Sequence, residues 1–135
     1  MNEQDLLATL DALGVSVAYA RRLPDDRVGE YHHRRRLIRL ERGMPRRLHR
    51  SVLAHECAHA VFEDVPSPFG PANARQERRA DQWAARHLIA LSEYCRAELL
   101  HEGHTGGMAV ELDVTTDLVE TYRALLHLAP LTEAA

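Results

Sequence analysis

The sequence predicts an α+β fold in which a small N-terminal three-stranded sheet packs on a bundle of helices. Three short runs, residues 15–23, 28–33 and 36–41, are predicted to be strands. Helical periodicity then dominates from residue 45 onward and includes a C-terminal pair of helices. We therefore expect one compact unit, with the sheet packed against the helices that follow it.

Length and composition predict a single domain spanning residues 1–135. A chain of 135 residues with 45% hydrophobic residues can bury one modest core. No run approaches the roughly 18 apolar residues of a membrane-spanning helix, and no signal peptide is expected at the start. Two cysteines, Cys57 and Cys95, make no disulfide framework, so we expect a cytoplasmic protein.

The first elements follow from periodicity and turn chemistry. Residues 3–13 are predicted to form an amphipathic helix whose leucines recur at helical spacing, and Gly14 ends it. Residues 15–23 form the first strand, which the turn sequence PDDR closes. After the remaining two strands, Pro45 fits the first turn of the next helix.

Residues 45–63 form the helix with the most informative motif, and the sequence PSPFGP stops it. His55, Glu56 and His59 spell H-E-x-x-H, two imidazoles that bracket a carboxylate. Four-residue spacing carries both histidines to one side of the helix, as two metal ligands require. Glu56 lies about 100° round the helix from His55, where a general base is needed. On this motif alone, two packed or surface histidines without a metal remain the alternative.

A third ligand is predicted on the next helix, residues 73–91. Glu77 and Asp81 lie on the apolar stripe of that helix, while its arginines occupy the opposite face. Because an unpaired carboxylate is costly to bury, both acids need partners. Zinc is a natural partner for Glu77, and Asp81 could accept the outer N–H of a zinc-bound histidine. Salt bridges from the two acids to nearby arginines are the alternative.

Two segments together carry a resemblance to a known family. The segment SVLAHECAHAVF, followed by ERRADQWAARHLI, resembles the ImmA/IrrE family of gluzincin-type metallopeptidases, whose pattern is H-E-x-x-H and then E-x-x-A-(D/N)-x-(F/W)-A. The residues that fill the second pattern are Glu77, Ala80, Asp81, Trp83 and Ala84. The resemblance covers roughly residues 10–125, and it departs from the family at Cys57 and in the segment ALSEY after Ile89.

The resemblance implies a zincin-like fold and an intracellular zinc endopeptidase. Family members typically cut a repressor with a helix-turn-helix of the Xre type, which implies a protein substrate of that kind. The implied site holds one Zn²⁺ through His55, His59 and Glu77, while Glu56 accepts a proton from the attacking water. Gluzincin sites usually add a His or Tyr that stabilises the oxyanion. His87 is the first candidate for that role, and the others are Tyr94, His101, His104 and Tyr122.

Positive charge is concentrated in one part of the chain. Residues 21–50 hold 11 arginines against four acids, although the whole chain has a net charge of −3. Zincins commonly have an edge strand beside the metal cleft, and a substrate can pair with it in extended form. If residues 34–41 supply that edge, Arg34, Arg36 or Arg39 could select acidic residues flanking the cut. A solvated basic face without this role is the alternative.

Residues 108–128 are predicted to form a short helix, a turn and a longer helix, with the core spacing of a helix-turn-helix. The second helix carries Asp117 and Glu120 against Arg123, so phosphates would be repelled and direct nucleic-acid binding is not expected. We expect this pair to pack on the rest of the domain or to dock a protein partner. Two alternatives to the enzyme remain open, a non-catalytic zinc-containing binding protein and a DNA-associated regulator.

Overall fold

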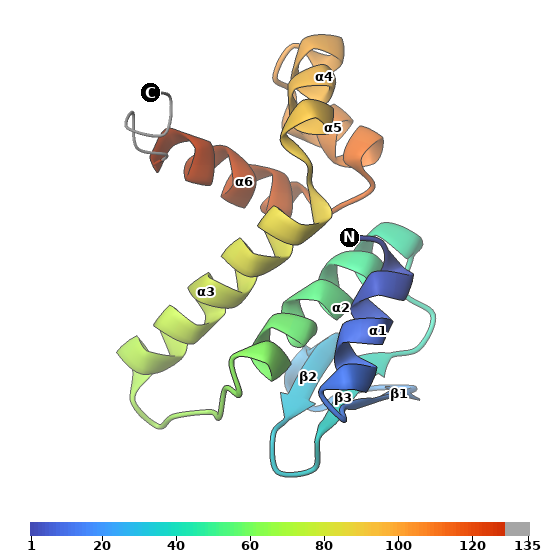
Figure 1. Ribbon diagram of the computed structural model, residues 1–135, viewed down its shortest axis with the longest axis vertical. Helices are drawn as coiled ribbons and strands as arrows, with labels where there is room; N and C mark the ends of the chain where they lie inside the picture. Colours follow the sequence, from blue (N-terminus) through green and yellow to red (C-terminus); the bar gives the residue numbers. More distant parts are fainter. Residues whose placement is uncertain (129–135) are drawn as a thin grey trace.

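A computed structural model describes residues 1–128 of the chain, and its elements are labelled in Figure 1. In chain order they are α1 (Glu3–Ala12), β1 (Ser16–Ala20), the 3-10 helix η1 (Pro24–Asp26), β2 (Gly29–His32), β3 (Leu37–Glu41), α2 (Arg46–Val61), α3 (Gly70–Leu88), α4 (Leu91–His101), α5 (Thr105–Leu112) and α6 (Thr116–Leu128). The predicted α+β class is confirmed, with one three-stranded sheet at the N-terminal end. No helix within residues 1–128 combines the length and the apolar character needed to cross a membrane.

β3 is the central strand of the sheet, which has the order β1–β3–β2. β1 runs parallel to β3, and β2 runs antiparallel to it. The prediction that residues 34–41 supply an edge strand is therefore wrong, because β3 is paired on both sides. Alternating side chains identify the buried face of β3, where Ile38 and Leu40 have no exposed surface, but they do not identify the strands that pair with it.

α2 lies between the sheet and α3 (Figure 1). Leu53 and Cys57 of α2 are fully buried. Ala58 of α2 and Ala80 and Ala84 of α3 are also fully buried. Such small side chains allow two helices to approach closely. This close approach brings together the two helices that carry the candidate metal ligands.

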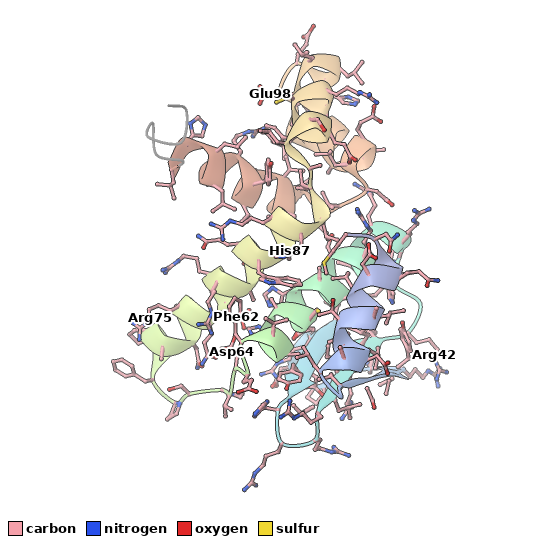
Figure 2. The ribbon with its side chains drawn as sticks, viewed as in Figure 1. Arg42, Phe62, Asp64, Arg75, His87 and Glu98 are labelled. Atoms are coloured by element: carbon pink, nitrogen blue, oxygen red, sulfur yellow. The ribbon has the colours of Figure 1, made fainter. Side chains whose placement is uncertain are left out.

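The C-terminal part comprises α4, α5 and α6, of which α4 was not predicted. α4 buries only Tyr94 and Ala97, too few apolar positions to produce a clear helical pattern in the sequence. Figure 2 marks Glu98, an exposed residue of α4, at the end of the molecule opposite the sheet. α5 and α6 agree with the predicted short and longer helices, and Val119 and Tyr122 of α6 belong to the hydrophobic core.

An arginine and a serine of α2 bind the turn between α5 and α6. Arg50 donates through Nη1 to the carbonyl oxygens of Asp113 at 2.7 Å and Leu112 at 3.1 Å. The backbone N–H of Thr115 donates to Oγ of Ser51 at 3.1 Å. Part of the basic segment therefore serves to dock the C-terminal helices on α2.

Replacing Arg50 with alanine is expected to lower the free energy of unfolding by about 1.5–3 kcal/mol, because charge-assisted bonds to two carbonyls are lost. Arg46→Ala is the matched control on the same helix. Arg46 pairs with Asp113 at 3.0 Å, but its side chain is 86% exposed, and such a pair contributes about 0–1 kcal/mol. Urea unfolding measures both variants, and equal losses would contradict this account of Arg50.

Candidate metal centre

Three side chains from α2 and α3 converge on one point. His55 Nε2 and His59 Nε2 lie 3.1 Å apart, one helical turn from each other on α2. Glu77 of α3 places Oε2 at 2.9 Å from His55 Nε2 and Oε1 at 3.1 Å from His59 Nε2. Each of the three residues offers a ligand atom within 4.8 Å of the other two, so the group could hold a metal ion. The carboxylate of Glu77 is thus turned toward the imidazoles and not toward an arginine.

The spacing of these atoms fits a tetrahedral metal site. A zinc ion lies about 2.0–2.1 Å from each imidazole nitrogen, which sets neighbouring ligand atoms about 3.3 Å apart. The nitrogen–nitrogen separation of 3.1 Å and the nitrogen–oxygen separations of 2.9 and 3.1 Å to the two oxygens of Glu77 are slightly shorter than that value. A small outward shift of the side chains would therefore accommodate the ion.

Hydrogen bonds behind each imidazole favour the tautomer that a metal ligand needs. His55 Nδ1 lies 2.7 Å from Oδ1 of Asp81, and His59 Nδ1 lies 2.9 Å from Oδ2 of Asp64. Because an ionised carboxylate only accepts, Nδ1 carries the hydrogen and Nε2 of the neutral ring presents its lone pair. Two lone pairs 3.1 Å apart, beside the Glu77 carboxylate, repel one another unless a proton or a metal cation lies among them. The donor set therefore fits a divalent cation.

In the metal-free protein, protons bound to the two imidazoles supply the positive charge that the neighbouring carboxylates favour. Burial lowers the pKa of His55, but its hydrogen bonds with Asp81 and Glu77 outweigh burial and raise that pKa to about 10. Burial also lowers the pKa of His59, and bonds with Glu77 and Asp64 raise it above its usual value. The bonds from His55 and His59 hold the pKa of Glu77 well below its usual range. A metal must displace these protons to bind.

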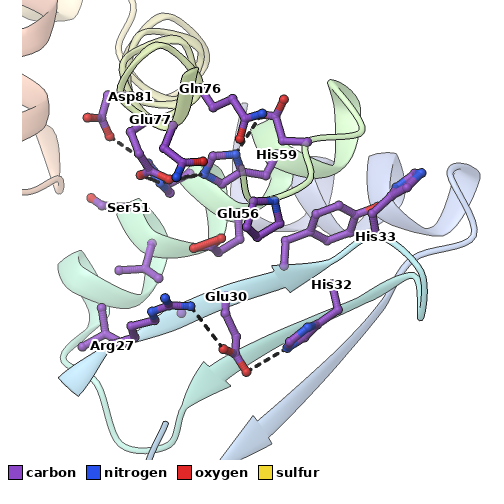
Figure 3. Close-up of a pocket in the computed structure, with 18 of the residues that line it drawn as sticks. Arg27, Glu30, His32, His33, Ser51, Glu56, His59, Gln76, Glu77 and Asp81 are labelled. Carbon is purple, nitrogen blue, oxygen red and sulfur yellow. Dashed lines mark hydrogen bonds and ion pairs between the residues drawn. The ribbon is translucent and has the colours of Figure 1, made fainter. Parts of the chain in front are cut away.

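Glu56 lies beside the ligand group without joining it (Figure 3). Only 6% of Glu56 is exposed, and burial raises the pKa of its carboxyl, although the nearby imidazoles oppose that rise. Gly29 of β2 makes the close packing possible. A Cβ at Gly29 would lie 3.2 Å from Glu56 Cγ and 2.5 Å from Val52 Cγ1. A buried carboxylate with a raised pKa, next to a metal site, is suited to accept a proton.

The ligand group lines a cavity of about 1080 Å³. β2 and the turn after it, which includes Arg34 and Arg35, contribute one part of the lining, and the start of α6 contributes Asp117 and Leu118. Figure 3 shows Glu56, His59 and the strand side of this cavity in one view. Small-molecule pockets commonly measure about 300–1000 Å³, so the cavity has room for a short stretch of peptide.

None of the five residues considered as oxyanion stabilisers lines this cavity. His87 stacks on Trp83 with ring centroids 3.9 Å apart, and its Nδ1 bonds to the Trp83 carbonyl at 2.7 Å. Tyr94 and Tyr122 pack against each other in the core. The His104 side chain caps α5, and the ring of His101, the last residue of α4, lies against Gly107. The prediction of His87 as the first candidate therefore fails on position.

Two polar aromatic residues that were not predicted line the cavity instead. Tyr31 and His33, on and just after β2, both contribute to its lining, and Tyr31 Oη lies 2.8 Å from His33 Nδ1. Tyr31 is largely buried, and it faces the same side of β2 as Gly29 because side chains two residues apart share a face. The sequence offers only their adjacency in GEYHH as a signal, because their approach to the metal group depends on the tertiary packing of β2 against α2.

The three arginines proposed to face a substrate have different surroundings. Arg34 lines the cavity at the turn between β2 and β3. Arg36 lies in the same turn, with a φ of 50°, but is not among the lining residues. Arg39 lies on the central strand, where its Nε is 3.4 Å from the buried carboxylate of Glu30. Arg34 and its neighbour Arg35 are thus the arginines of this turn that reach the cavity.

Comparisons with known proteins bear on the family and on the fold. Residues 23–116 match a family of unknown function, DUF6639. The chain belongs to this family. The range that matches DUF6639 contains His55, Glu56, His59, Glu77 and Asp81. A comparison with curated proteins found no match.

A solved structure resembles this fold. It is that of a Mycobacterium tuberculosis transcriptional regulator, with a TM-score of 0.65 and 18% sequence identity. The match covers 87% of this chain but only 39% of the regulator, so this chain corresponds to less than half of that protein. At this identity the likeness concerns the fold alone.

Gly29→Ala is expected to lower the free energy of unfolding by about 1–3 kcal/mol, because the added methyl group would clash with Val52 and crowd Glu56. Gly70→Ala is the matched control. Gly70 has open space around its Cβ direction and lies at the start of α3, where alanine should be neutral or slightly stabilising. Urea unfolding of both variants tests the close approach of β2 to α2. A Gly29→Ala protein as stable as the control would refute it.

The stability of the metal-free protein is expected to fall as the pH rises from about 6.5 to about 10. The pKa of His55 is raised from 6.5 to about 10, so its contribution is complete below pH 6.5 and is lost as the pH rises through the folded-state value. Unfolding in the presence of a chelator at a series of pH values measures this slope. His55→Asn should flatten the slope, and an unchanged slope in that variant would show that another group causes it.

Proposed function

We propose that this protein is a zinc-dependent endopeptidase with a zincin-like fold, similar to the gluzincin-type ImmA/IrrE metallopeptidases. One observation carries the proposal. The ligand atoms of His55, His59 and Glu77 meet at 2.9–3.1 Å, with the buried carboxylate of Glu56 beside them on a cavity. A zinc site that only stabilised the fold would usually have four protein ligands, whereas this group offers three and has a buried carboxylate at its edge.

The chain's own residues supply the proton transfers and the orientation. A zinc ion held by His55, His59 and Glu77 would polarise a carbonyl group and make a water molecule more acidic. Asp81 orients the His55 ring by accepting a hydrogen bond from Nδ1–H of His55. A carboxylate oxygen of Glu56 accepts the proton of the attacking water and returns it to the nitrogen of the leaving amine. The raised pKa of Glu56 brings this carboxylate closer to a working pH near neutrality.

Tyr31 is proposed to donate its O–H to the carbonyl oxygen as negative charge develops on it, while His33 Nδ1–H donates to Tyr31 Oη. Both residues line the cavity that His55, His59 and Glu77 line, and the hydrogen bond of 2.8 Å from His33 holds the phenol in a defined direction. Donors fixed in advance around a developing oxyanion commonly contribute about 2.7–4 kcal/mol to lowering the barrier. This role replaces the one first assigned to His87.

The substrate is proposed to be a protein segment, and the resemblance to ImmA/IrrE suggests a repressor of the helix-turn-helix Xre type in the cytoplasm. The cavity of about 1080 Å³ suits a short extended segment better than a single side chain. Arg34 and Arg35 on the lining of this cavity favour acidic residues near the cut.

Replacing both Arg34 and Arg35 with glutamate should weaken cleavage of an acidic substrate and reduce the dependence of cleavage on salt.

A second candidate is a non-catalytic, zinc-containing regulator that binds protein or associates with DNA on the same fold. Its specific support is the fold likeness to a transcriptional regulator. Direct DNA contact through α6 is unfavourable, because Asp117 and Glu120 would repel the phosphates. The two candidates differ in one requirement, because only the enzyme needs Glu56 as a proton acceptor.

Glu56→Gln is expected to retain about one zinc ion per chain but to lose cleavage by at least about 100-fold, because the proton acceptor is lost while the ligands remain. His55→Ala should lose both zinc and cleavage. The assay combines metal analysis with mass spectrometry of the fragments formed when an Xre-type repressor is incubated with the protein. Glu98→Gln, on the exposed side of α4, is the control and should match the unmodified protein.

Cleavage by Glu56→Gln at the normal rate would contradict the enzymatic proposal. Zinc binding that survives His55→Ala unchanged would contradict the assigned ligand set.

A further inference from the structure

The chain that leaves α2 turns back onto His59. Phe62 caps the helix, and Glu63 adopts a left-handed conformation with φ of 55°. This turn lets Asp64 contact His59 twice. The backbone N–H of Asp64 donates to the His59 carbonyl oxygen at 2.9 Å, and Oδ2 of Asp64 lies 2.9 Å from His59 Nδ1. The contact therefore depends on the end of the helix and not on helical spacing.

Arg79 of α3 holds the Asp64 carboxylate from the other side. Its Nη2 donates to Oδ1 of Asp64, and its guanidinium lies over the Phe62 ring at 4.1 Å from the centroid. Figure 2 labels Phe62 and Asp64 close to α3. The Asp64 side chain is only 6% exposed, and a buried carboxylate needs a counter-charge, which Arg79 supplies. We call Phe62, Asp64 and Arg79 the Asp64 clamp.

The clamp differs from the support behind the other histidine. Asp81 bonds to His55 from α3, but its side chain is 49% exposed. Asp64 is almost fully buried and is fixed by both Arg79 and its own backbone, so it can adopt fewer positions. Because Asp64 accepts from Nδ1, the His59 ring is fixed with Nε2 toward His55 Nε2 and Glu77 Oε1, each at 3.1 Å.

We propose that Asp64, held by the Asp64 clamp, is the positioning residue for His59 and that it sets the metal affinity of the centre. This inference rests on the metal-binding part of the proposed function and not on peptide hydrolysis. Arg79 follows Glu77 by two residues on α3. The helix that supplies the third ligand therefore also holds the carboxylate that orients the second ligand, so displacement of α3 would disturb both together.

Zinc titration of Asp64→Ala and Asp64→Asn against a competing chelator tests the role of the carboxylate. The affinity of Asp64→Ala for Zn²⁺ should fall about 10–100-fold, as is typical when the hydrogen-bond partner of a ligating histidine is removed. Asp64→Asn should lose less, because the amide oxygen can still accept from Nδ1–H. If Asp64→Ala does not fold, the Asn variant alone decides the test.

A spectroscopic measurement separates positioning from a general loss of structure. Long-range ¹⁵N NMR of the zinc-loaded protein should show His59 with hydrogen on Nδ1 and nitrogen Nε2 bound to metal. In Asp64→Ala the His59 signals should shift or broaden, while those of His55 stay unchanged because Asp81 still holds that ring. Equal changes at both histidines would indicate that Asp64 is merely structural and would overturn the inference.

Arginines of α3 provide a matched pair for the outer part of the clamp. Arg79→Ala should weaken zinc binding less than Asp64→Ala does, because the carboxylate stays but loses its counter-charge and support. Arg75→Ala, one turn earlier on the same exposed side of α3, should bind zinc like the unmodified protein.

Zinc affinities in Asp64→Ala and Arg79→Ala equal to that of the unmodified protein would overturn this inference and leave the proposed function standing. An unmodified protein that binds no zinc would overturn both.

Discussion

The structure depends on one close approach between charged and polar groups. Two imidazole nitrogens of α2 and a carboxylate of α3 lie within 3.1 Å of one another. Lone pairs and negative charge face each other there, so the arrangement needs either protons on the imidazoles or a cation among the three side chains. The rest of the fold serves to hold it. α2 is buried between the sheet and α3, and fully buried alanines permit the close packing of α2 against α3.

Charge around the centre points to the same conclusion. The carboxylates of Glu56, Asp64, Glu77 and Asp81 surround two imidazoles, and Arg79 is the cation paired with this group among the described residues. With neutral imidazoles, the group carries an excess of negative charge that a divalent ion would largely offset. The raised pKa of His55 shows that this imidazole binds a proton more readily when no metal is bound, and the bonds from His55 and His59 in turn hold the pKa of Glu77 below its usual range.

The ligand group was accessible to sequence reasoning because helix geometry is regular. The four-residue spacing of His55 and His59 determines that they share a face, and the stripe of Glu77 and Asp81 places both acids on the side of α3 that faces α2, although both side chains stay partly exposed. The three strands were also predicted, since their boundaries follow from turns and alternation. What the pattern left undetermined was the order of the strands, because one buried face is compatible with several pairings.

The remaining contributors depend on contacts that no local pattern encodes. Asp64 reaches His59 only because Glu63 adopts a left-handed conformation at the end of α2. Gly29 matters only because β2 packs within contact distance of Glu56. α4 was missed because Leu99 and Leu100 are exposed and few of its residues are buried, so its hydrophobic pattern is weak.

X-ray absorption spectroscopy of the zinc-loaded protein tests the central claim most directly. The account predicts one zinc with two imidazole nitrogens at about 2.0–2.1 Å, further oxygen ligands at about 2.0–2.2 Å, and no sulfur. A sulfur ligand at about 2.3 Å would indicate binding at Cys57 or Cys95 and would contradict the account. A shell without imidazole scattering would contradict it equally.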